Sequence, residues 1–173
     1  LGFGQFPEAS GLDGVSSNGT ADTDGIVVLY KSIGSTDSPN ALATGGYANY
    51  NKGRTLTHEL GHWLGLRHTW GDGGCSTDDY CSDTPPTGSA NYNCDAASSC
   101  GHNDMIENYM DYTYDACMNV FTLDQKTRMR TVMMNSPRRL PLMTSDRAGD
   151  MGNPLPVELI SYDVKLFDNQ TSW

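Results

Sequence analysis

The sequence has few of the features that are typical of membrane-spanning or nucleic-acid-binding proteins. No apolar run approaches the roughly 20 residues that a membrane-spanning helix needs. Lysine and arginine number only 11 against 21 acidic residues, and the net charge is −10, whereas nucleic-acid-binding proteins usually carry a basic patch. The chain begins at Leu1 without a signal sequence, so we expect any signal or pro-segment to have been removed or to lie outside this sequence.

Histidine is also scarce, and its distribution is informative. Three of the four histidines fall in the segment 58–68, which reads H-E-x-x-H-x-x-G-x-x-H. The fourth, His102, stands alone in a loop, so no Ser or Cys nucleophile paired with a histidine base competes with this motif. The motif therefore predicts a zinc site.

The spacing of the motif predicts how a helix would place its side chains. At about 100° of rotation per residue, His62 lies roughly 40° from His58 and one turn above it. Glu59 lies on the flank at about 100°, where its carboxylate can reach a metal-bound water without being a ligand, so it is the candidate general base. Four apolar side chains fall on the opposite side, which we expect to pack in the core: Leu56, Leu60, Trp63 and Leu64.

The third histidine requires the helix to stop. A continued helix would carry His68 about 9 Å beyond His62, too far for zinc, whose nitrogen ligands lie at about 2.0 to 2.1 Å. Gly65 can end the helix because a residue without a Cβ tolerates positive φ. Three neutral imidazoles would leave the fourth position of a tetrahedral zinc open to water, which is typical of a catalytic site.

The extended motif resembles that of the metzincins. The segment 108–113, N-Y-M-D-Y-T, is also similar to their Met-turn, the methionine-bearing loop beneath the zinc. Four further short segments carry a more specific resemblance: G-R-T at 53–55, H-T-W at 68–70, D-T-P-P at 83–86 and D-A-C-M-N at 115–119. With them the chain is identified as a member of the pappalysin family of zinc metalloproteases, in its ulilysin-like and cytophagalysin-like branch.

The resemblance implies an α+β fold with a mixed twisted sheet, an active-site helix, the Met-turn and a C-terminal helix. Residues 1–144 would form this catalytic domain, which we expect to be incomplete at its N-terminus because metzincins have a helix and further strands before the first segment present here. Residues 145–157, with several glycines and prolines, read as a linker. Residues 158–173 contain alternating apolar residues and resemble the start of a C-terminal β-module.

Individual roles also follow from the resemblance. It implies that His58, His62 and His68 bind zinc and that Glu59 is the general base. Met110 would support the site from below. Tyr112 would be the tyrosine that moves between the zinc and the oxyanion, although a buried aromatic with a satisfied hydroxyl is the simpler reading of the residue alone.

The stretch 71–104 is almost all loop and holds four of the five cysteines. The sequence alone cannot pair them, and zinc binding by cysteine is disfavoured because the spacings lack a paired C-x-x-C pattern. The resemblance implies two disulfides, Cys75 with Cys100 and Cys94 with Cys117. Cys81 is then left over, either as a buried thiol or as a site of intermolecular pairing.

Two further sites depend on the resemblance. It implies structural calcium in the same loop, where oxygen ligands suited to a hard cation are Asp78, Asp79, Asp83 and Thr84, although a solvated acidic turn fits these residues equally well. Asp115 and Ala116, which follow the Met-turn, would lie near the pocket for the substrate side chain just after the scissile bond. If Asp115 points into that pocket, it would favour Arg or Lys there.

The sequence therefore predicts a secreted zinc endopeptidase that hydrolyses protein or peptide substrates with a metal-activated water and Glu59 as general base. The alternative is a catalytically silent, zinc-bearing module for peptide binding or adhesion. An intact Glu59 argues against that alternative, because a module without turnover has no evident need for a carboxylate beside the zinc. No oligomeric state follows from the sequence.

Overall fold

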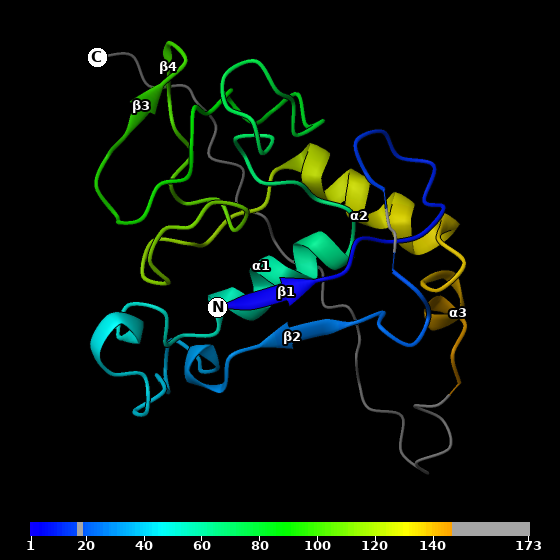
Figure 1. Cartoon of the computed structure of the whole chain (residues 1–173), viewed down its shortest axis with the longest axis horizontal. Coiled ribbons are helices and arrows are strands. Elements are labelled where there is room, and N and C mark those ends of the chain that lie inside the picture. Colours follow the sequence, from blue (N-terminus) through cyan, green and yellow to red (C-terminus); the bar gives the residue numbers. More distant parts are fainter. Residues whose placement is uncertain (17–18, 147–173) are drawn as a thin grey trace. The chain divides into compact units, whose positions relative to one another are not determined.

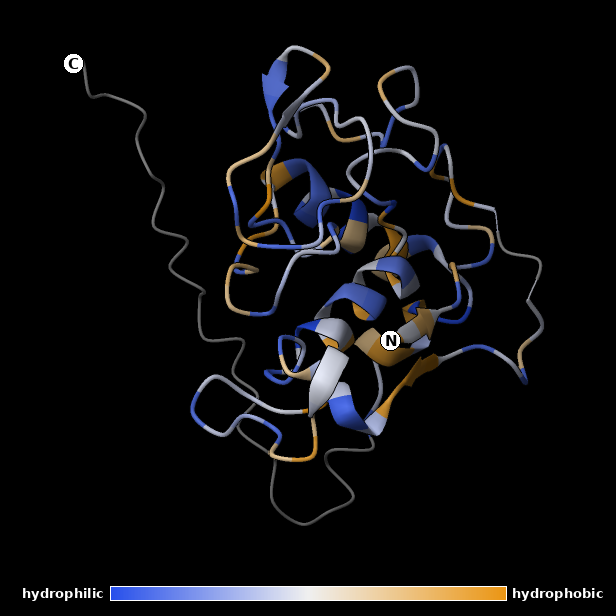
Figure 2. Cartoon of the chain, turned by 60° about the vertical axis from the view of Figure 1, so that its left-hand side comes forward, coloured by the Kyte–Doolittle hydropathy of each residue, from blue (hydrophilic) through white to orange (hydrophobic). Residues whose placement is uncertain are grey.

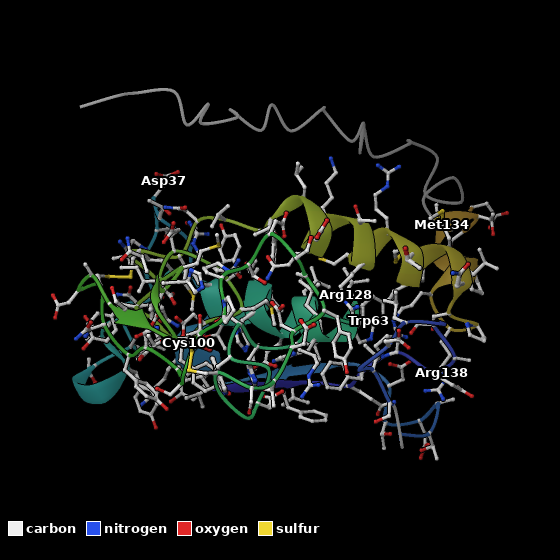
Figure 3. All side chains as sticks on the ribbon, turned by 90° about the horizontal axis from the view of Figure 1, so that it is seen from above. Asp37, Trp63, Cys100, Arg128, Met134 and Arg138 are labelled. Atoms are coloured by element: carbon white, nitrogen blue, oxygen red, sulfur yellow. A yellow bond between two sulfur atoms is a disulfide. The ribbon has the colours of Figure 1, made fainter. Side chains whose placement is uncertain are left out.

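The computed structural model of this chain describes residues 1–16 and 19–146, and its centre is the active-site helix α1 (Arg54–Trp63). This helix lies between a small sheet and the helix α2 (Leu123–Asn135), as two perpendicular views show (Figures 1 and 3). The remaining elements are short: β1 (Gly2–Gly4), β2 (Ile26–Val28), η1 (Tyr30–Ser32), η2 (Gly45–Tyr47), β3 (Ser98–Ser99), β4 (His102–Asn103) and α3 (Leu140–Met143). The predicted α+β class is confirmed, and the predicted linker and β-module lie, beyond residue 146, outside the described residues.

The strands β1 and β2 form an antiparallel pair that packs against α1. Phe3 is paired with Val27, and both side chains are exposed on the far side of this sheet. In Figure 2 the whole of β2 is hydrophobic. On the helix side β1 presents glycine, which lets its backbone approach α1 closely: a Cβ at Gly4 would lie 2.2 Å from the carbonyl oxygen of Glu59.

We expect Gly4→Ala to destabilise the protein by about 1–3 kcal/mol, because the atom that the new methyl group meets belongs to the backbone of α1 and cannot rotate away. Gly25→Ala is the matched control, since an added Cβ there meets nothing within 4 Å. Urea unfolding of the two variants gives the comparison. Equal stability of both variants would show that β1 moves freely relative to the helix.

The burial of α1 differs from the prediction. Leu56 and Leu60, expected in the core, are 44% and 41% exposed, while Trp63 and Leu64 are half-buried. The side that carries His58 and Glu59 is buried instead. The reason is that β1 and the Met-turn both pack against its histidine and glutamate side.

Both ends of the helix α2 follow from its local sequence. Its capping box is present: the Thr122 hydroxyl accepts the Gln125 amide N–H at 3.2 Å, and the Gln125 side chain accepts the Thr122 amide N–H at 2.9 Å. It ends at Asn135, shortly before Pro137. No helix among residues 1–16 and 19–146 is long and apolar enough to cross a membrane.

A buried ion pair holds the end of α1 in place. Arg139 is only 1% exposed and donates to both carboxylate oxygens of Asp24, at 2.5 and 2.8 Å. Its guanidinium stacks on the Trp63 ring at 3.6 Å, and its Nε donates to the Trp63 carbonyl at 3.3 Å. The Trp63 indole N–H also donates to Asp24, so three segments distant in sequence meet at one point.

Candidate active site

Three imidazoles converge at the end of α1. His58 and His62 come from the helix, and Gly65, with a φ of 87°, turns the chain back so that His68 joins them. The Nε2 atom of His62 lies 3.1 Å from the Nε2 atoms of both other histidines. Within the described part of the chain, this is the only group of three or more His, Cys, Asp or Glu side chains that could hold a metal ion.

The Nδ1 atom of each ring, the outer nitrogen on the side away from the converging Nε2 atoms, faces a group that can only accept a hydrogen bond. Nδ1 of His58 lies 2.7 Å from the Tyr109 carbonyl, and Nδ1 of His62 lies 2.8 Å from the Leu66 carbonyl. Nδ1 of His68 faces the carboxylate of Asp72. Each Nδ1 therefore carries the ring proton, which leaves three Nε2 lone pairs facing one another. Such lone pairs cannot bond to one another, so the donor set fits a cation and, with three imidazoles, fits zinc.

Burial keeps these rings neutral, as a metal ligand requires. Burial together with the neighbouring histidines lowers the pKa of His58 to about 3. Burial, with a contribution from His68, lowers the pKa of His62 to about 4. The pKa of His68 is also lowered, chiefly by burial, although Asp72 acts in the opposite direction.

We expect the two buried histidines to cost the metal-free protein stability as the pH falls below about 6.5. In the unfolded chain histidine titrates near pH 6.5, whereas buried His58 and His62 titrate near 3 and 4, so at mildly acidic pH the unfolded state binds more protons. In this range each of these histidines alone lowers the free energy of unfolding by about 1.4 kcal/mol per pH unit, whereas Glu59 and Asp79, whose pKa values burial raises to about 7 and about 6, act in the opposite direction. The fall should therefore be clearest in Glu59→Gln, which removes one opposing group. Urea unfolding at pH 7.5 and pH 5 measures this fall. The control His102→Gln should leave it unchanged, because His102 is exposed. A pH dependence of Glu59→Gln no steeper than that of the parent chain would contradict the expectation.

Glu59 lies on the flank of the histidine group, where the helical spacing places it. Glu59 is 7% exposed, and the amide N–H of Gly4 in β1 hydrogen-bonds to its carboxylate. Burial raises the pKa of Glu59 to about 7. A carboxylate with a pKa near neutrality is suited to accept and return a proton.

The Met-turn lies directly beneath the helix. Met110 is fully buried, and a Cβ at Gly61 would lie 2.4 Å from its sulfur. The Met110 carbonyl accepts the amide N–H of Thr69, next to the third histidine, at 3.3 Å. Asn108 joins the turn to α2 through paired amide hydrogen bonds with Gln125, at 3.0 and 3.1 Å. These contacts fix the turn below the histidine group.

Aromatic rings border the site on the side of His68. The Trp70 ring is nearly parallel to the His68 ring, with centroids 4.3 Å apart and an interplanar angle of 5°. The centroid of Tyr112 lies 4.9 Å from that of His68 and 5.4 Å from that of His58. Burial raises the pKa of Tyr112, so its hydroxyl stays protonated and can donate a hydrogen bond.

Asp115 lies at the start of α1 rather than free in the loop. Its Oδ2 atom accepts the amide N–H groups of Lys52 at 2.6 Å and of Arg54 at 3.3 Å. Its Oδ1 atom is buried and has no hydrogen-bond partner, and burial raises the pKa of the carboxyl group. Ala116, the next residue, is exposed. A role of either residue in substrate selection stays a prediction.

The acidic residues predicted to bind calcium have separate partners. The Asp79 carboxylate accepts the Thr84 hydroxyl at 2.8 Å and the Cys81 amide N–H at 3.0 Å. Asp78 accepts the amide N–H of Tyr80, and Asp83 accepts that of Asp124. In the described residues these carboxylates do not form a group of three that could hold a metal. Burial raises the pKa of Asp79 to about 6.

The long loop 71–104 is cross-linked to itself and to the Met-turn region. The structure contains the two disulfides that the resemblance implies, Cys75–Cys100 and Cys94–Cys117. Cys81 is a free, buried thiol, and burial raises its pKa to about 12, so intermolecular pairing is not its role here. Asn91 adds a third connection, since its backbone and side-chain N–H groups donate to the buried Asp111 carboxylate, both at 2.9 Å.

The sequence motif does not predict two residues that support the site, Asp111 in the Met-turn and Asp72 beside His68. Asp111 is buried between Met110 and Tyr112, and its partner Asn91 is 20 residues away, so no local spacing signals the pair. Asp72 lies only four residues after His68, and this short spacing is a signal that a search for partners of the ligands could use.

Comparison with known proteins gives a consistent result. The family model of Peptidase_M43, described as pregnancy-associated plasma protein-A, matches residues 13–134. An extracellular metalloprotease of Sordaria macrospora is 42% identical over 134 residues, which cover 75% of this chain and 42% of the relative. Extracellular metalloprotease 1 of Coccidioides posadasii is 43% identical over 136 residues, 76% of this chain and 44% of the relative. The chain thus spans less than half the length of these curated relatives.

A solved structure is similar over most of this chain. Mature mirolysin of Tannerella forsythia, in complex with a cleaved peptide, matches with a TM-score of 0.67 and 39% sequence identity. The match covers 89% of this chain and 54% of that one.

Proposed function

This chain belongs to the pappalysin family of metalloproteases, Peptidase_M43, and on that premise we propose that it is the catalytic part of an extracellular zinc endopeptidase. The observation that carries the proposal is the convergence of three Nε2 lone pairs beside a buried carboxylate. The cleaved peptide bound to mirolysin supports protein or peptide as the substrate class. The relatives named extracellular metalloproteases support secretion.

In this proposal His58, His62 and His68 hold the zinc, which when bound would polarise the scissile carbonyl and lower the pKa of a water molecule. Glu59 takes the proton of that water and returns it to the departing amine. Its position on the flank of the histidine group and its raised pKa suit it to this proton transfer. The Tyr112 hydroxyl, protonated and next to the histidines, donates to the developing oxyanion.

Chelation tests the proposal directly. The purified chain is incubated with a protein substrate and mixed peptides, with and without a zinc chelator, and the cleavage sites are identified by mass spectrometry. Cuts that the chelator abolishes and added zinc restores are expected. Zinc bound at one ion per chain without any cut would overturn the proposal and favour the silent binding module.

The same cleavage sites test the role of Asp115 in substrate selection. If the Asp115 carboxylate attracts a substrate cation from its buried position, Arg or Lys should predominate just after the cut. Apolar residues at that position would contradict this role of Asp115.

Structural calcium at Asp78, Asp79, Asp83 and Thr84 is a separate proposal. A rise in unfolding temperature with added calcium is the measurement that tests it.

A further inference from the structure

The three histidines of the site are not held in the same way. His58 and His62 stand on α1, and their outer nitrogens bond to backbone carbonyls. His68 lies beyond the turn at Gly65, outside any helix, and it alone has a charged side chain as its partner. Its orientation therefore depends on residues of its own loop.

Asp72 is placed to fix that orientation. One oxygen of its carboxylate accepts from Nδ1 of His68, and the other lies 3.4 Å from the Arg67 guanidinium. Arg67 also donates to the Gly71 carbonyl at 2.7 Å, which holds the loop beside it. The backbone of Asp72 is in the left-handed region, with a φ of 63°, a conformation that non-glycine residues adopt only where contacts compensate for it.

Trp70 restricts the tilt of the His68 ring, a motion that the hydrogen bond to Asp72 leaves free. Its parallel contact at 4.3 Å prevents the imidazole from tilting, while the hydrogen bond to Asp72 sets its rotation. Together they aim Nε2 at the other two histidines. A carboxylate that accepts from the outer nitrogen also increases the basicity of the inner nitrogen, and such partners typically contribute 10–100-fold to metal affinity.

We propose that Asp72 is a positioning residue that orients His68 and sets the affinity of this site for zinc, and this inference rests on the zinc site of the proposed function. The role of Asp72 is not to contact the metal or the substrate. It acts through the His68 ring, so its removal should weaken metal binding while His58 and His62 remain in place.

Zinc affinity is the decisive readout. Zinc is titrated at pH 7.5 into the metal-free parent chain, Asp72→Ala and Asp72→Asn, in competition with a chromophoric chelator. The expected increase in Kd is about 10–100-fold for Asp72→Ala. A smaller increase is expected for Asp72→Asn, because its amide oxygen can still accept the hydrogen bond without the charge. Asp37→Ala is the control for the loss of one negative charge, because Asp37 is exposed and at the periphery of the structure (Figure 3).

Cobalt substitution separates positioning from a general loss of structure. The visible absorption spectrum of bound Co²⁺ reports the geometry of its ligands and should change in both Asp72 variants but not in Asp37→Ala. If Asp72→Ala does not fold, the isosteric Asp72→Asn carries the test through both readouts. A parent-like Kd and spectrum in the Asp72 variants would overturn the inference. A parent chain that binds no zinc would instead contradict the proposed function.

Discussion

Replacement of Glu59 by glutamine is expected to lower kcat for peptide hydrolysis by about 10²- to 10⁴-fold, the usual contribution of a positioned general base. Glutamine has nearly the same shape, so the buried position between β1 and the histidines stays filled, but its amide cannot accept a proton from water. Zinc content should remain at the parent value because Glu59 is outside the histidine group. Cleavage of a fluorogenic peptide and metal analysis of the same sample measure both quantities.

Glu107→Gln is the matched control for this variant, since Glu107 is an exposed glutamate on the same chain. It should retain the parent kcat. Parent-like activity in Glu59→Gln, with zinc bound, would show that another group removes the proton and would refute the assignment of the base. Loss of zinc together with activity would show that Glu59 supports the metal site rather than the proton transfer.

Replacement of Arg139 by alanine is expected to destabilise the protein by about 3–5 kcal/mol, the typical effect of removing one partner of a buried ion pair. Asp24, whose side chain is 8% exposed, would lose the nearer of its two guanidinium partners and keep only Arg138, 3.5 Å away. The stacking on Trp63 at 3.6 Å would also be lost. The midpoint of urea unfolding, followed by tryptophan fluorescence, measures the change.

Two further variants make this prediction specific. Arg130→Ala removes an exposed arginine from α2 and should change the free energy of unfolding by less than about 0.5 kcal/mol. The double variant Arg139→Ala with Asp24→Ala should be more stable than Arg139→Ala alone, because it removes the buried carboxylate that Arg139→Ala leaves with only the more distant Arg138. A double variant no better than the single one would mean that Arg139 acts through packing alone.

Local spacing explains which features could be predicted from the sequence. The positions of His58 and His62, the flank position of Glu59 and the turn at Gly65 all follow from the geometry of one helix and its end. The capping box of α2 likewise depends on residues three apart. The disulfide pairs did not follow from spacing but were implied by the family resemblance, and the structure contains them.

The remaining features depend on contacts between distant segments. Arg139 is buried because Asp24, 115 residues away, and Trp63 meet it, and nothing in the local sequence indicates this. The exposure of Leu56 and Leu60 depends on which face of α1 its neighbours cover, and an amphipathic pattern alone does not settle that. The motif identified the helix correctly, but the apolar residues opposite the histidines were wrongly assigned to the core.

The cross-linked loop 71–104 has a consequence for the survival of the molecule. An endopeptidase binds its substrates as extended segments, and irregular surface loops are where proteases usually cut a folded protein. A loop fixed by Cys75–Cys100 and Cys94–Cys117 cannot become an extended segment unless it first unfolds locally. If the chain has the proposed activity, we expect the two disulfides to slow self-digestion in a concentrated preparation.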